Sequence, residues 1–210
     1  MIVVAIDIGL TNLGLCKVRV RGKDDYECLV ADLVDTTSFI CDQRTCKLRH
    51  SACHVDWIDH LLQRYRADFD EADIVLIERQ PPLGHKAPEQ LLYAALRDKA
   101  VLIHPRSFLA WVGIGSMDYE LRKDAIVRRA KRIYKDDVAQ TALKRERAHD
   151  IGDCLNFVDY HVATDKAMQR RFEKPIPPLL CAAFDQLEQF RFCGKRKRDT
   201  NENKKSYCFS

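Results

Sequence analysis

Long hydrophobic runs are absent from the 210 residues of this chain. None approaches the ~18–20 apolar residues that a membrane-spanning helix needs, so we expect no membrane segment. The N-terminus, MIVVAIDIG, has neither a basic stretch before its apolar residues nor a small-residue cleavage site, and a secretory signal is therefore not expected. These absences predict an intracellular protein.

An excess of one charge is also lacking over most of the chain. Residues 1–193 contain 29 basic and 29 acidic residues, whereas residues 194–210 contain six basic and two acidic ones. A hydrophobic content of 46% is typical of a globular protein, and a body of this length can bury a substantial core. We expect one folded domain over 1–193 and, because 194–210 is poor in apolar residues, a flexible basic tail.

Basic residues nevertheless cluster within the neutral body. Residues 122–147 contain ten basic and four acidic residues. Such clustering favours a polyanionic partner, most often nucleic acid. A solvated helix face together with a solubilising tail would have the same composition.

Cysteine, by contrast, is plentiful, and its nine residues form an odd number. Without a secretion signal, reduced thiols are expected rather than disulfides. Four of the cysteines have apolar neighbours in the sequence and are predicted to be small core residues. They are Cys16, Cys28, Cys154 and Cys181.

The apolar pattern predicts an α/β protein. Strands are expected at 2–8, 13–20 and 26–34, joined by short links as an antiparallel meander, and at 74–78 and 100–104. Helices are expected at 54–69, 87–98, 118–135, 145–164 and 178–192. Three strands, then alternating helices and strands, then helices, indicate a mixed five-stranded sheet flanked by helices.

Two carboxylates stand within or at the end of apolar strands. Asp7 lies in IVVAIDIG, and Glu78 ends the run IVLIE. Burying a carboxylate is costly unless it is paired, hydrogen-bonded or bound to a metal. Because α/β proteins form sites at the carboxyl ends of strands, the two acids predict a site at that edge of the sheet. A strand-end acid facing water would explain either residue alone.

A second pair of acids, Asp150 and Asp153 in AHDIGDCLNF, is spaced so that both point the same way on a helix. The remaining positions are largely apolar, so this helix is expected to pack against the body, where two like charges repel unless a cation lies between them. Together with Asp7 and Glu78, these carboxylates suit Mg²⁺ or Mn²⁺. Two such ions roughly 4 Å apart would activate water and stabilise the leaving oxygen in phosphodiester hydrolysis.

The segments AIDIGLTNLG, IERQPP and ERAHDIGDCL, in this order, resemble the RuvC-like Holliday junction resolvases, in particular the branch carried by large DNA viruses such as poxviruses and iridoviruses. The resemblance covers about residues 1–165. It implies a ribonuclease H-like fold, a homodimer and Mg²⁺-dependent symmetrical nicking of four-way DNA junctions. It also implies that Asp7, Glu78, Asp150 and Asp153 bind the metal and are catalytic. A viral member would act where viral DNA replicates, in the cytoplasm or the nucleus of the host cell.

Parts of the sequence also suggest three functions other than a resolvase. DIGLTN is also similar to the first phosphate loop of sugar kinases and actin-like proteins, but those have two such domains, and this chain has eight glycines and no second glycine-rich loop. A nucleic-acid-binding protein with a degenerate site is one alternative. A related nuclease that acts on RNA–DNA hybrids or flaps is another, because selectivity depends on dimer geometry and groove shape.

The basic residues just before the second acidic pair are candidate DNA contacts. Lys144, Arg145, Arg147 and His149 are predicted to neutralise the scissile phosphate or to assist proton transfer, although an exposed basic turn would have the same sequence. Residues 122–135 and the tail are predicted to contact the DNA backbone, with salt-dependent and sequence-tolerant affinity.

A cysteine- and histidine-rich segment at 41–54 interrupts the pattern between strand and helix. Cys41, Cys46, His50 and Cys53 have the spacing C-x4-C-x3-H-x2-C, which offers the four N or S donors of a tetrahedral structural zinc site. His54 and His60 are further candidates for the fourth ligand. A chance cluster in a cysteine-rich chain is the alternative.

Overall fold

A computed structural model describes residues 1–39, 41–42 and 44–172. Five strands form one mixed sheet: β1 (Ile2–Asp7), β2 (Leu13–Gly22), β3 (Asp25–Val34), β4 (Ile74–Glu78) and β5 (Ala100–Ile103), in the order β3-β2-β1-β4-β5. The first three strands pair antiparallel, and β4 and β5 are parallel to β1. The expected mixed five-stranded sheet is thus confirmed.

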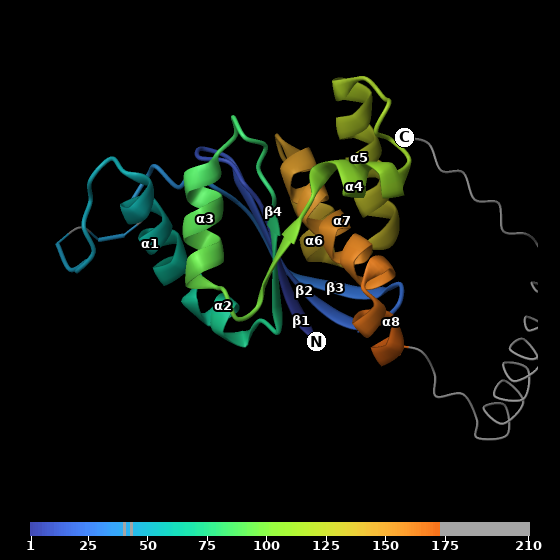
Figure 1. The fold of residues 1–210 in the computed structure, drawn as a ribbon, viewed down its shortest axis with the longest axis horizontal. Coiled ribbons are helices and arrows are strands. Elements are labelled where there is room, and N and C mark those ends of the chain that lie inside the picture. The colour runs from blue at the N-terminus through green and yellow to red at the C-terminus, as the bar shows by residue number, and fades with distance from the viewer. Residues whose placement is uncertain (40, 43, 173–210) are drawn as a thin grey trace, which may run out of the picture. The chain divides into compact units, whose positions relative to one another are not determined.

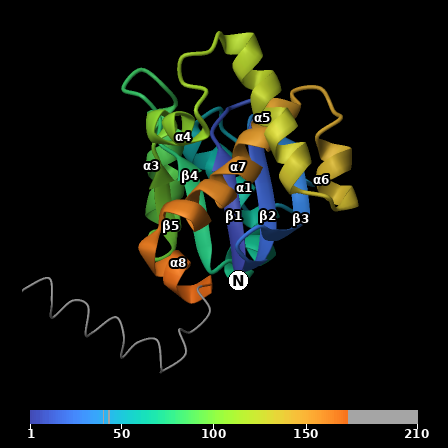
Figure 2. The ribbon, with the colours of Figure 1, turned by 90° about the vertical axis from the view of Figure 1, so that its right-hand side faces the viewer.

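Helices cover both faces of this sheet (Figures 1 and 2). One face carries α1 (His54–Arg64), α2 (Arg66–Glu71) and α3 (Lys86–Ala95). The other carries α4 (Pro105–Val112), α5 (Tyr119–Ile133), α6 (Asp137–Ala142), α7 (Ala148–Thr164) and α8 (Lys166–Phe172). Alternate strand residues supply the two cores: Val3 and Ala5 of β1 face the α7 side, and Val4 and Ile6 face the α1 side.

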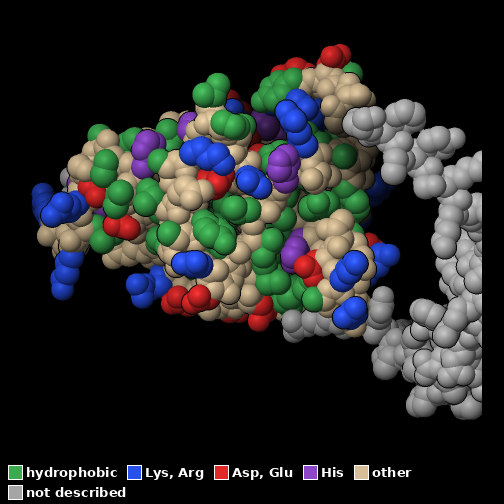
Figure 3. Space-filling model, in the orientation of Figure 1, with side chains coloured by type: hydrophobic (Ala, Val, Ile, Leu, Met, Phe, Trp, Pro, Cys, Tyr) green, Lys and Arg blue, Asp and Glu red, His purple; other side chains and the backbone are tan. Residues whose placement is uncertain are grey.

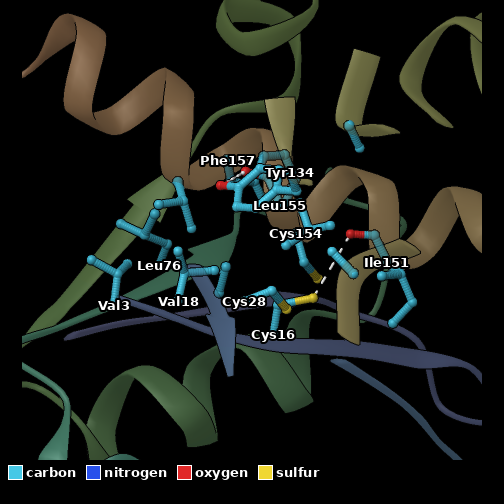
Figure 4. Close-up of a cluster of buried hydrophobic side chains, with 14 of the residues drawn as sticks. Val3, Cys16, Val18, Cys28, Leu76, Tyr134, Ile151, Cys154, Leu155 and Phe157 are labelled. Carbon is cyan, nitrogen blue, oxygen red and sulfur yellow. Dashed lines mark hydrogen bonds between the residues drawn. The ribbon is translucent and has the colours of Figure 1, made fainter. Parts of the chain in front are cut away.

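Three cysteines belong to the core on the α7 side, as expected. Cys16, Cys28 and Cys154 are buried among Val3, Leu76 and the apolar face of α7 (Figure 4). The thiol of Cys16 donates a weak hydrogen bond to the Ile151 carbonyl, 3.8 Å away. The Cys28 thiol donates to the Val30 carbonyl, and all three cysteines act as small apolar side chains rather than as metal ligands. Cys181 lies outside the described residues.

Several helices begin or end at other residues than the sequence predicts. The helix expected at 54–69 is divided at Tyr65, whose backbone leaves the helical region and whose hydroxyl donates to Asp32. The helix expected at 145–164 begins at Ala148, because Arg147 adopts a positive φ of 56°. The sequence reading also missed α4, α6 and α8, which are only six to eight residues long.

The remaining expectations concern the C-terminal part of the chain and membrane-spanning segments. The helix expected at 178–192, the domain limit at 193 and the basic tail lie outside the described residues. Among the helices that the structure describes, none is sufficiently long and apolar to cross a membrane.

Candidate active site

Asp7 and Glu78 are the last residues of two neighbouring strands. β1 and β4 are parallel and aligned with Ile6 beside Ile77, so the two carboxylates leave the sheet at the same edge. Their strands bury apolar residues on both faces, and both acids are half-buried. The predicted pairing of strand-end acids is therefore present in the fold.

The second acidic pair reaches this edge because α7 approaches the sheet closely at its first turn. Gly14 pairs with Asp7 in the β1–β2 ladder, and a Cβ at position 14 would lie 2.7 Å from the backbone oxygen of Asp150. A glycine at this point lets α7 touch the strand. Asp150 and Asp153, one turn apart on α7, are thereby brought to Asp7 and Glu78.

The electrostatics show that the four acids form one group. Burial raises the pKa of Asp7 well above its usual value, and the charges of Glu78 and Asp153 raise it further. Burial also raises the pKa of Glu78, with a contribution from Asp150. The pKa of Asp153 is raised to about 8 by burial and by Glu78 and Asp150. Ionising all four carboxyls at this one point is therefore unfavourable, and a bound cation would relieve the repulsion between them.

A network of polar side chains holds Glu78 in place. The Gln80 side-chain amide donates to Glu78, and the Gln80 backbone N–H donates to the buried carboxylate of Glu89. Lys86 pairs with Glu89 at 2.9 Å, and hydrogen bonds from Lys86, Gln80 and Gln90 keep the pKa of Glu89 below its usual value despite its burial. The loop after β4 is therefore anchored to α3, which orients the Glu78 carboxylate.

The four basic residues predicted around the start of α7 occupy two kinds of position, either beside Asp150 or exposed in the preceding turn. Arg147 Nε donates to Asp150 at 2.8 Å, and His149 Nε2 lies 3.1 Å from the other oxygen of that carboxylate. Burial, with Lys123 and Arg147, lowers the pKa of His149 by more than the nearby Asp150 raises it, so this ring favours its neutral form. Lys144 and Arg145 are exposed in the turn between α6 and α7.

Three adjoining hollows, here called the groove, open beside Glu78 and Asp153. The central hollow, about 210 Å³, includes Glu78 and Asp153 in its lining. It shares Glu78 with a hollow of about 780 Å³ beside α4, and Lys123 with one of about 450 Å³ along α5. The cations that line the groove are Arg79, Lys86, Arg106, Arg122, Lys123, Arg128 and Lys131. Figure 3 shows blue and purple side chains gathered over the loop after β4 and beside α4 and α5.

No family model matches the chain, and no curated protein matches it in sequence. Among solved structures, the chain is similar to the fowlpox virus resolvase in complex with substrate Holliday junction DNA, with 17% identity and a TM-score of 0.53 over 79% of this chain and 100% of that one. The fowlpox virus Holliday junction resolvase in a separate structure has 15% identity and a TM-score of 0.51, over 78% and 99% of the two chains. The yeast mitochondrial Holliday junction resolvase has 13% identity and a TM-score of 0.54, over 80% and 83%.

This chain has the fold of the Holliday junction resolvases. At these identities the likeness concerns the backbone, and it extends over nearly the full length of the fowlpox protein. The ribonuclease H-like architecture expected from the sequence is thereby confirmed.

Within this resolvase fold, several groove residues were not recognised from the sequence. Arg79 and Arg106 follow the ends of β4 and β5, and Lys86 begins α3. Nothing in their spacing links them, because the parallel strands alone bring these segments together. Arg122 and Lys123 fall within the basic stretch 122–135, which was expected to contact DNA.

The Cys/His segment also departs from its expected ligand set. Ligand atoms of Cys41, Cys46, His50 and His60 lie within 4.8 Å of one another, and Cys53 is not part of this group. Cys53 is exposed and precedes the first turn of α1, where its sulfur accepts a hydrogen bond from the Ser51 hydroxyl. His60, two turns further along α1, takes the place that the sequence spacing assigned to Cys53.

Proposed function

We propose that this protein is a Holliday junction resolvase, a metal-dependent endonuclease that nicks four-way DNA junctions symmetrically. The observation that carries the proposal is the convergence of Asp7, Glu78, Asp150 and Asp153 from β1, β4 and α7, with Glu78 and Asp153 lining a groove that also contains seven cations. The fold shared with the fowlpox virus resolvase, which was crystallised with Holliday junction DNA, supports the same assignment.

The four acids fit a hard divalent cation. Their donors are carboxylate oxygens, which Mg²⁺ and Mn²⁺ prefer. Burial and the neighbouring carboxylates raise the pKa values of Asp7 and Asp153, and bound cations would offset this cost of ionising them. Mg²⁺ bound here would supply a water of lowered pKa and charge stabilisation at the leaving oxygen.

The chain's own groups supply the remaining requirements of phosphodiester hydrolysis. Gln80 and Glu89 keep Glu78 oriented, and Arg147 does the same for Asp150. His149, neutral and beside the acids, is suited to accept or pass on a proton. The groove cations attract phosphates on both sides of the carboxylates, so that a DNA strand lies with one phosphodiester over the acids.

A junction has two strands to cut, and the described residues of one chain contain one such group of acids. We therefore propose that the protein acts as a homodimer, which would present two sites to opposite strands. Lys144 and Arg145, exposed beside α7, are proposed as additional phosphate contacts.

The test is a nicking assay on a synthetic four-way junction with purified full-length protein in Mg²⁺. Paired nicks at symmetrical positions are expected for the wild-type protein. Asp7→Asn keeps the side-chain shape but removes a charge, so cleavage should fall at least 100-fold while junction binding persists. Cleavage of flaps or RNA–DNA hybrids in preference to junctions would replace the proposed substrate. Wild-type nicking by Asp7→Asn would refute the assignment of the site.

A further inference from the structure

We infer that Cys41, Cys46, His50 and His60 bind one Zn²⁺, at a site separate from the carboxylates. The Sγ of Cys41 lies 3.1 Å from His50 Nε2, and the Sγ of Cys46 lies 3.6 Å from His60 Nε2. The two Nε2 atoms are 3.2 Å apart. Tetrahedral zinc with its usual bond lengths separates two nitrogens by about 3.3 Å and a nitrogen from a sulfur by about 3.6 Å. The four side chains are therefore already spaced as ligands of one ion.

The orientation of His60 is the second observation in favour of a metal. Its Nδ1–H donates to the carbonyl oxygen of Asp56, 2.6 Å away and one turn earlier on α1. This bond leaves Nε2 without a proton in the neutral ring and directs its lone pair toward Cys46 and His50. A backbone carbonyl that holds the distal ring nitrogen is the usual outer support of a zinc-bound histidine.

An aromatic side chain closes one side of the cluster. The ring of Phe39 packs against His50 and His60, with centroid distances of 5.1 and 4.7 Å. His60 itself is buried, with 8% of its surface exposed. A partly desolvated pocket of two thiols and two imidazoles suits Zn²⁺, which binds such soft and borderline donors far more tightly than Mg²⁺ does.

The segment around the cluster explains what the ion would do. Between β3 and α1, the described residues of 35–53 form no helix or strand, and they lack enough apolar side chains for a core of their own. The backbone must be ordered by other means, and metal binding supplies folding free energy in such small units. The cluster lies on the α1 side of the sheet, whereas Asp150 and Asp153 are on α7 (Figure 1). The ion is therefore structural and takes no part in phosphodiester hydrolysis.

The decisive measurement is the zinc content of the full-length protein and its variants, purified without chelator. Wild-type protein should contain about one zinc per chain, and Cys46→Ser and His60→Asn should lose it. Cys53→Ser and His54→Asn are matched controls, since both residues are neighbours in sequence but outside the cluster, and both variants should keep the metal.

A second measurement does not depend on whether a ligand variant folds. Wild-type protein stripped of metal and titrated with Co²⁺ should develop the intense visible absorption of a tetrahedral thiolate site and saturate at one equivalent. Zn²⁺ should abolish this absorption, and excess Mg²⁺ should not. A zinc-free wild-type protein that shows no such absorption would overturn the proposal, as would loss of zinc in Cys53→Ser but not in His60→Asn. Junction nicking is assayed separately, so failure of the nuclease proposal would leave this result intact.

Discussion

The backbone carbonyl of Asp150 lies against Gly14, so near that a Cβ on Gly14 would be 2.7 Å from its oxygen. Gly14 is also the ladder partner of Asp7. One glycine on β2 thus sets the separation between the strand that carries Asp7 and the helix that carries Asp150 and Asp153. The geometry of the acidic site depends on the absence of a side chain at a position that contributes no chemistry.

Gly14→Ala should therefore impair catalysis as well as stability. The added methyl group must push the first turn of α7 away from β2, which we expect to cost about 1–3 kcal/mol of unfolding free energy. The same shift moves Asp150 from Asp7, and junction nicking should fall at least tenfold. Denaturant unfolding and single-turnover nicking are the two measurements.

Gly22→Ala, on the same strand, is the matched control. A Cβ at that position would meet only the Cβ of Asp25, 3.9 Å away. This variant should nick junctions as the wild type does. Equal activity of Gly14→Ala and wild-type protein would show that α7 does not need this close approach.

The raised pKa of Asp153 predicts how the metal-free protein responds to pH. In the folded protein this carboxyl holds its proton up to a pKa of about 8, against 3.8 for an ordinary aspartate. Between these values the folded state binds more protons than the unfolded state, so its contribution to stability is present at low pH and is lost as the pH rises toward 8. Asp153→Asn cannot ionise and should escape this loss.

The measurement is urea unfolding of both proteins in EDTA from pH 5 to pH 8. The variant should gain stability over the wild type as the pH rises, by on the order of 1–3 kcal/mol at pH 8. Mg²⁺ should reduce the difference because it neutralises the same charges in the wild type. A difference that stays constant with pH would contradict the electrostatic account of the site.

Lys123 of α5 lines two of the three hollows of the groove and is predicted to contact a phosphate. Lys123→Ala should weaken junction binding to a similar extent on different sequences. It should also reduce the slope of log K against log salt by about one, because one counterion fewer is released. Lys23→Ala is the control, since Lys23 is exposed in the β2–β3 hairpin at the opposite edge of the sheet. Equal slopes for the two variants would remove Lys123 from the DNA interface.

The sequence by itself determined the five strands, because each strand is marked by a continuous or alternating run of apolar residues. It also singled out Asp7 and Glu78, since a carboxylate within or at the end of an apolar strand is costly without a partner. The spacing of Asp150 and Asp153 indicated one helix face, and local periodicity is sufficient for that inference. The short helices α4 and α6 were missed because six to eight residues show too little periodicity, although His104 and Asp136 accept hydrogen bonds from the backbone of their first turns.

Only the tertiary structure decided which distant residues share a site. Parallel pairing of β1, β4 and β5 brings Arg79 and Arg106 to the edge that holds Asp7, and the register of that pairing is set by long-range contacts rather than by local sequence. The fourth member of the Cys/His cluster was decided in the same way. Spacing alone favoured Cys53, but Cys53 is exposed just before α1, and the helix turns His60 toward Cys46 and His50. A ligand set depends on the positions of atoms in space. On α1, His60 reaches His50 although it is ten residues away in sequence, whereas Cys53, only three residues away, does not join the group.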